Sequence, residues 1–124
     1  MFFVDRSAVV LKPTQVFLDW LNRTDDDMPD LTLAQLRSNC SVFLLPAFDE
    51  PEQAVAYFDE RYEEIFVAEL ASWVGDANQY PQDLSLENFW KFFELEVHDM
   101  VLDLVDEELE VSNVMPTTVP TEAK

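Results

Sequence analysis

The sequence is poor in glycine, cysteine, histidine and positive charge. In 124 residues there is one glycine, one cysteine, one histidine and seven Lys and Arg together. A single cysteine excludes an intrachain disulfide, and we expect Cys40, which precedes an apolar run, to be a small buried hydrophobe. One glycine leaves no glycine-rich loop that could hold a phosphate. The scarcity of Lys and Arg disfavours direct binding to nucleic acid or to an anionic membrane.

Long apolar runs are also missing. No run approaches the ~18–20 residues that are needed to cross a bilayer. The beginning, MFFVDRSAVVLK, has no basic region, no long apolar stretch and no small-residue cleavage site, so it does not have the pattern of a signal peptide. We therefore expect a cytoplasmic protein.

Acidic residues are abundant, with 26 Asp and Glu and a net charge of −19. A small domain usually carries a charge of magnitude about 2–8. The excess lies in residues 49–110, which hold nineteen acids and only Arg61 and Lys91, whereas residues 1–48 have a net charge of only −2. Since 48% of the residues are hydrophobic, a folded core is expected despite the charge. Cations and basic protein surfaces are the partners that such a chain suits.

The patterns predict a single small α+β domain in residues 1–110, with three or four helices packed with a few short strands. We expect residues 111–124, rich in Pro and Thr, to be a disordered tail. Segment 100–105 fits either a strand or the end of a helix. Short apolar runs predict strands, and 3.6-residue periodicity with capping residues predicts helices. The strands are expected at 8–11 and 41–46, and the helices from Pro13, at 32–37, at 51–73, and from Ser85 through Val97.

The stretch DERYEEIF, residues 59–66, lies in the longest predicted helix. On a helical wheel its carboxylates fall opposite the apolar stripe, and they form like-charge pairs four residues apart, Asp59 with Glu63 and Glu60 with Glu64. Like charges at this spacing destabilise a helix, which favours a binding surface over its simpler alternative, a solvated face. Tyr57, at the edge of this face, is a candidate aromatic anchor. The predicted partner-binding residues are Glu52, Tyr57, Asp59, Glu60, Glu63 and Glu64.

No set of residues has the spacing of a metal or catalytic site. Di-iron bundles need two Glu-x-x-His pairs, and this chain has only His98. Glu94, four residues before His98, predicts a structural pair, and no nucleophile motif accompanies it. We therefore expect no catalytic residue, metal or cofactor. Glu69 falls within the apolar stripe of the predicted helix, where we expect a salt bridge to Arg6, Arg23 or Arg37.

Several segments resemble a family of short acidic bacterial proteins of unknown function. They are VDRSAVVLKP, FLDWLN, FDEPEQAVAYFDERYEEIF and LENFW, which lie between residues 4 and 90, and the resemblance is expected to cover most of the chain. The resemblance implies a bacterial cytosolic protein, and it implies no catalytic residue.

The expected function is an acidic interaction module that binds a basic protein surface. A nucleic-acid-binding protein is one such partner, and the module would then act as an immunity-type inhibitor or a DNA mimic. The alternative is a small carboxylate- or metal-dependent hydrolase. A dimeric chaperone for a secreted effector would require a large exposed apolar patch. The sequence does not decide the oligomeric state.

Overall fold

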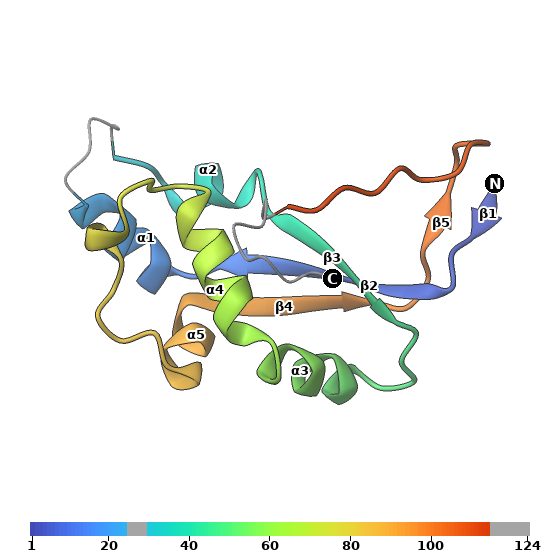
Figure 1. Cartoon of the computed structure of the whole chain (residues 1–124), viewed down its shortest axis with the longest axis horizontal. Helices are drawn as coiled ribbons and strands as arrows, with labels where there is room; N and C mark the ends of the chain where they lie inside the picture. Colours follow the sequence, from blue (N-terminus) through green and yellow to red (C-terminus); the bar gives the residue numbers. More distant parts are fainter. Residues whose placement is uncertain (25–29, 115–124) are drawn as a thin grey trace.

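The computed structural model describes residues 1–24 and 30–114, whose elements are labelled in Figure 1. Helices and short strands are mixed along this part of the chain, and together they form one small α+β domain, as predicted. The elements in order are β1 (Phe2–Phe3), β2 (Arg6–Pro13), α1 (Gln15–Arg23), α2 (Leu33–Arg37), β3 (Ser41–Pro46), α3 (Pro51–Asp59), α4 (Tyr62–Ala71), the 3-10 helix η1 (Ala77–Gln79), α5 (Leu86–Phe92), β4 (Phe93–His98) and β5 (Leu102–Asp103).

The main sheet is antiparallel and has three strands in the order β3-β2-β4. The central strand, β2, is paired on both sides, so that Val9 lies opposite Phe43 of β3 and Val97 of β4. A separate ribbon joins β1 to β5, with Phe3 opposite Leu102. Both β3 and β4 are therefore edge strands of the main sheet within the described residues.

The helices cover one face of this sheet, where α4 crosses the strands in Figure 1. The alternating β2 residues Val9 and Leu11 are fully buried on that face. Beneath the helices lies a cluster of aromatic rings in tilted or edge-to-face contact, such as Phe66 with Phe89 at 5.5 Å between centroids. The opposite face carries exposed apolar side chains on β3, with Val42 63% and Leu44 49% exposed.

The first predicted helix begins later than expected. Pro13 is the last residue of β2, and α1 begins at Gln15 after the N-cap Thr14. A proline suits a strand end as well as a first helical turn, because both tolerate a missing N–H. By contrast, the strand at 41–46 and the short helix after Thr32 are confirmed, and Thr32 forms a capping box with Gln35.

The predicted helix at 51–73 is wrong in its continuity. It is broken at Glu60 and Arg61, where Arg61 has φ −127° and ψ 13°. The Arg61 guanidinium donates a hydrogen bond to the Tyr57 carbonyl oxygen (3.0 Å), which satisfies a carbonyl at the end of α3. The like-charge pairs of the predicted wheel therefore straddle a break. Glu63 and Glu64 instead lie in the first turn of α4, where the helix dipole stabilises carboxylates.

The predicted helix from Ser85 through Val97 is wrong beyond residue 92. Ser85 is the N-cap as predicted, and its Oγ accepts a hydrogen bond from the Asn88 N–H (3.2 Å). The helix ends at Phe92, and pairing with β2 makes the next residues a strand with alternating burial. Segment 100–105 contains the short strand β5. Residues 111–114 form neither helix nor strand, and the rest of the predicted tail, 115–124, lies outside the described residues.

Candidate functional site

Three exposed glutamates gather at the junction of α3 and α4. Glu60, Glu63 and Glu64 surround Arg61 and line a shallow hollow of about 220 Å³ with it. Arg61 forms an ion pair with Glu60 at 3.3 Å, and its guanidinium also lies over the Tyr57 ring, 3.5 Å from the centroid. A single cation therefore serves three carboxylates, and the junction keeps a local excess of negative charge.

The other predicted partner-binding residues lie in different surroundings. Glu52 is exposed in the first turn of α3 and lines neither this hollow nor the larger groove described below. Asp59 is half-buried and accepts a hydrogen bond from Trp90 Nε1 at 2.7 Å, so it joins α3 to α5. The half-buried Tyr57 has Arg61 over its ring and Phe48 beside it, with the two ring centroids 5.8 Å apart.

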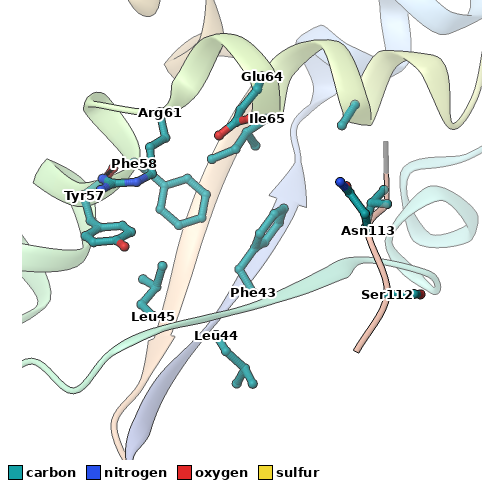
Figure 2. Close-up of a pocket in the computed structure, with 12 residues that line it drawn as sticks. Phe43, Leu44, Leu45, Tyr57, Phe58, Arg61, Glu64, Ile65, Ser112 and Asn113 are labelled. Atoms are coloured by element: carbon teal, nitrogen blue, oxygen red, sulfur yellow. Dashed lines mark hydrogen bonds between the residues drawn. The ribbon is translucent and has the colours of Figure 1, made fainter. Parts of the chain in front are cut away.

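A larger groove of about 460 Å³ lies between β3 and the two helices of the junction. Figure 2 shows Tyr57, Phe58 and Ile65 on the helix side and Phe43 and Leu45 on the strand side, with Leu44 pointing away from the helices. Phe43 and Phe58 pack edge to face at 5.3 Å. Arg61 and Glu64 also line the groove, so its apolar floor is continuous with the glutamate cluster. Residues 112–114 form one end of it.

The direction of the backbone groups along β2 follows from two hydrogen bonds at its end. The Thr14 N–H donates to the Phe92 carbonyl (2.8 Å), at the boundary of α5 and β4. The Pro13 carbonyl is turned the other way and accepts from Arg37 Nε of α2 (2.8 Å). In an antiparallel ladder the backbone groups of successive residues alternate in direction. The even-numbered residues of β2 therefore bond to β4, and the odd-numbered residues bond to β3.

This alternation places unpaired backbone groups on the outer edge of β3. Phe43 pairs with the odd-numbered Val9 and so bonds inward, to β2. Val42 and Leu44 pair with even-numbered residues, and their N–H and C=O groups point outward, where no described strand pairs with them. Pro46 belongs to the same outward set, where the absence of an N–H breaks no sheet hydrogen bond. Among residues 1–24 and 30–114, the edge of β3 beside the groove is therefore open.

The sequence predicts SVFLLP as a strand but does not mark it as a functional element. The segment carries no charge and ends in proline. Both features were available as signals, since proline within sheets is confined to edge strands, first strand residues or bulges. The groove itself depends on which helices pack beside the strand, which no local pattern gives.

Glu69 lies at the other end of β3, and its predicted salt bridge is wrong. Its carboxylate accepts a hydrogen bond from Ser41 Oγ at 2.7 Å, and within the described chain it pairs with none of the three arginines. Arg37 binds Glu94 (2.9 Å), and Arg6 binds Asp5 (2.9 Å). Burial raises the pKa of Glu69, and the Ser41 hydrogen bond opposes that effect.

Cys40, immediately before β3, is half-buried and not fully buried as expected. Its Sγ donates a hydrogen bond to the Arg37 carbonyl oxygen (3.3 Å). Desolvation raises the pKa of this thiol above its usual value, with a smaller opposing effect of Arg37. A raised thiol pKa lowers the thiolate fraction, so the side chain has little nucleophilic character.

His98 lies on β4 and does not pair with Glu94. Its Nε2 lies 2.7 Å from Glu96 Oε2, since residues two apart share a face of a strand. Lys12 of β2 approaches Glu96 at 3.5 Å on the same face. The His98 hydrogen bond lowers the pKa of Glu96, with Lys12 adding to the effect. These side chains form a surface charge network.

The described residues contain no group of three or more His, Cys, Asp or Glu side chains arranged to hold a metal ion. None of the helices in residues 1–24 and 30–114 is both long enough and apolar enough to span a membrane. The sequence matches no protein-family model, and comparison with curated proteins and with solved structures gives no significant match.

Proposed function

We propose that the protein is an acidic interaction module that binds a basic protein surface through the junction of α3 and α4. The observation that carries this proposal is the cluster of Glu60, Glu63 and Glu64 around one cation, beside an apolar groove. Charge complementarity accelerates encounter and selects partners, while an adjacent apolar floor supplies contact area. Glu52 adds to the field from the start of α3, whereas Tyr57 and Asp59 support the junction from within.

A nucleic-acid-binding protein is a suitable partner, because its binding surface is rich in Lys and Arg. An immunity-type inhibitor that covers such a surface needs one concentrated acidic patch, which the junction provides. A DNA mimic needs carboxylates spread over several elements. Here Glu87 is paired with Lys91 on α5, and Glu94 is paired with Arg37 on the sheet face away from the helices. The geometry therefore favours a local patch over extended DNA mimicry.

The proposal can be tested with two variants that lose the same amount of charge. The first replaces the junction carboxylates (E52Q, E60Q, E63Q, E64Q) and leaves Asp59, which is bonded to Trp90, unchanged. The matched control replaces four exposed acids elsewhere (D106N, E107Q, E108Q, E110Q). Both variants and the original chain are immobilised on a resin and incubated with lysate at low salt. The retained proteins are eluted with a salt gradient and identified by mass spectrometry.

We expect one dominant basic protein that the original chain and the control retain and the junction variant loses. Its affinity for the junction variant should be lower by about fourfold to several hundredfold, since four exposed charge pairs at roughly 0.2–1 kcal/mol each add to roughly 0.8–4 kcal/mol. Its affinity for the original chain should also fall with ionic strength, because the Debye length shortens from about 10 Å at 0.1 M to about 3 Å at 1 M. Equal retention by both variants, or affinity independent of salt, would show that the junction does not bind by charge.

A further inference from the structure

We propose that the partner enters as an extended segment that pairs with the open edge of β3 and adds a strand to the sheet. This inference rests on the proposed function, because it assigns a binding mode to the same acidic groove. Three independent observations support it: the outward backbone groups of β3, the shape of the groove beside them, and the charge at its rim.

The backbone groups are the first observation. Val42 and Leu44 direct their N–H and C=O groups to the outer edge of β3, where no described strand pairs with them. An open edge of this kind is a template for strand addition, in which main-chain hydrogen bonds supply affinity and flanking pockets supply specificity. The exposed positions of Val42 (63%) and Leu44 (49%) also leave room for neighbouring side chains on the outer face.

The groove is the second observation. It follows β3 through three consecutive residues, Phe43 to Leu45, and its opposite wall is formed by Phe58 and Ile65. An added strand would lie ~4.8 Å from β3, and its side chains would point alternately into the groove and onto the outer face. One half of its side chains would therefore meet the groove, and the other half would meet Val42 and Leu44.

The charge is the third observation, and it identifies the occupant. Glu64 lines the groove, with Glu60 and Glu63 beside it, whereas the outer face of β3 is purely apolar. Lys or Arg side chains that enter the groove can lay their aliphatic stems on the aromatic floor and bring their charges to these glutamates. Arg61 already lies in this way over Tyr57. We therefore assign the groove to an extended segment that alternates basic with aliphatic residues.

A second copy of this chain suits the edge less well. Pairing two β3 strands would bring two glutamate clusters together, each on a chain of net charge −19. Like charges that approach across an interface oppose association. The charge of the junction therefore selects a basic partner over self-pairing.

The test uses a synthetic peptide of alternating lysine and valine, compared with a block peptide of the same composition in which all lysines precede the valines. Amide hydrogen exchange is followed by NMR on the full chain. Without peptide, we expect the Val42 and Leu44 amides to exchange faster than those of Phe43 and Leu45, which bond to β2. The alternating peptide should slow exchange at Val42 and Leu44, and the block peptide should not.

Two substitutions at one position separate the backbone from the side chain. Leu44→Pro removes the outward N–H without breaking a bond to β2, and Pro46 already lacks the same N–H two residues later. The substitution should lower the affinity for the alternating peptide by about tenfold or more. Leu44→Ala keeps the N–H and should bind within about threefold of the original chain. Circular dichroism melting verifies that both variants fold. If Leu44→Pro does not fold, the exchange measurement on the unsubstituted chain still tests strand addition.

The outcomes distinguish this inference from the proposed function. If the alternating and block peptides bind equally, with no slowing at Val42 and Leu44, strand addition is wrong. In that case, if the E60Q, E63Q, E64Q variant binds neither peptide, the result still supports the proposed binding by charge. If no peptide binds at low salt, strand addition is likewise overturned, and the retention experiment decides the function separately.

Discussion

The two edge strands of the main sheet differ in how their outer faces are covered. On β4, the side chains of Glu94, Glu96 and His98 lie on the solvent-facing side of the sheet and form a network with Arg37 and Lys12. On β3, the outward residues are Val42, Leu44 and Pro46, and no residue of the strand is charged. Charged outward side chains are a common protection against unwanted strand pairing. Within the part of the chain that the structure describes, the sheet therefore has one edge strand with charged solvent-facing side chains and one without.

The difference also extends to what lies behind each strand. The edge of β3 borders the groove and the glutamate cluster. On β4, by contrast, Glu94 is paired with Arg37 and Glu96 with Lys12. At the helix junction, the three glutamates of the cluster share Arg61. Among the described residues, acids paired with a cation of the fold can therefore be distinguished from acids that share one cation.

The largest expected effect concerns the support behind β3. Phe58→Ala removes a fully buried ring that packs on Phe43 and should reduce the free energy of unfolding by about 3–5 kcal/mol. Leu95→Ala, at a half-buried position of β4, should cost less, because part of that side chain already contacts water. Urea denaturation of both variants measures the two losses. Equal losses would show that the packing behind the two strands does not differ in this way.

A smaller effect is expected for the hydrogen bond between Trp90 and Asp59, which joins α5 to α3. Trp90→Phe removes the indole N–H that bonds Asp59, which leaves a half-buried carboxylate without this donor. The free energy of unfolding should fall by about 1–3 kcal/mol. A double-mutant cycle with Asp59→Ala, which removes the acceptor oxygens, isolates the interaction, since the second substitution should cost little once the first has been made. Additive losses in the double variant would mean that the hydrogen bond does not couple α3 to α5.

The smallest effects are opposite pH dependences of the carboxylates beside the two strands. The pKa of Glu69, at the start of β3, is raised by burial, so its ionisation destabilises the fold as pH rises through that pKa. Glu69→Gln keeps an acceptor for Ser41 and should raise the melting temperature at pH 7, with the difference disappearing below the unfolded value of 4.5.

Glu96, on β4, should behave in the opposite way. Its pKa is lowered, first by the His98 hydrogen bond, so its ionised form contributes stability above the unfolded pKa and loses it as pH falls through the folded pKa. Glu96→Gln should therefore lower the melting temperature slightly at pH 7 and have no effect in strong acid. Thermal melts of both variants from pH 3 to pH 8 provide the comparison. Shifts of the same sign at pH 7 would contradict it.

Local patterns were sufficient to predict the α+β class, the strand at 41–46, the short helix at 32–37 and the N-cap at Ser85, because each depends on neighbours in sequence. The strand at Phe93–His98 was missed because the same apolar residues also fit a helical stripe, and pairing with β2 decides between the two. The helix break at Arg61 depends on a side chain that bonds back to the Tyr57 carbonyl and stacks on its ring.

Only the part of the candidate site that depends on neighbours in sequence was predictable. The abundance of carboxylates in DERYEEIF is visible in the sequence, and the structure brings Glu60, Glu63 and Glu64 together around Arg61. The hydrogen bond from Trp90 to Asp59 joins residues that are 31 positions apart, and no short-range pattern indicates it. The open edge of β3 requires the strand order, which is a property of the whole sheet.

The ribbon of β1 and β5 has one more consequence for the groove. It fixes Leu102 and Asp103 against the first residues of the chain, and residues 112–114 form one end of the groove. The eight residues between these points make nine Cα–Cα steps, which span at most about 32 Å at roughly 3.3–3.6 Å per step. A segment on so short a tether has an effective concentration of about millimolar at its site. A strand added along β3 would therefore lie beside residues 112–114 of the same molecule, whose local concentration does not fall on dilution.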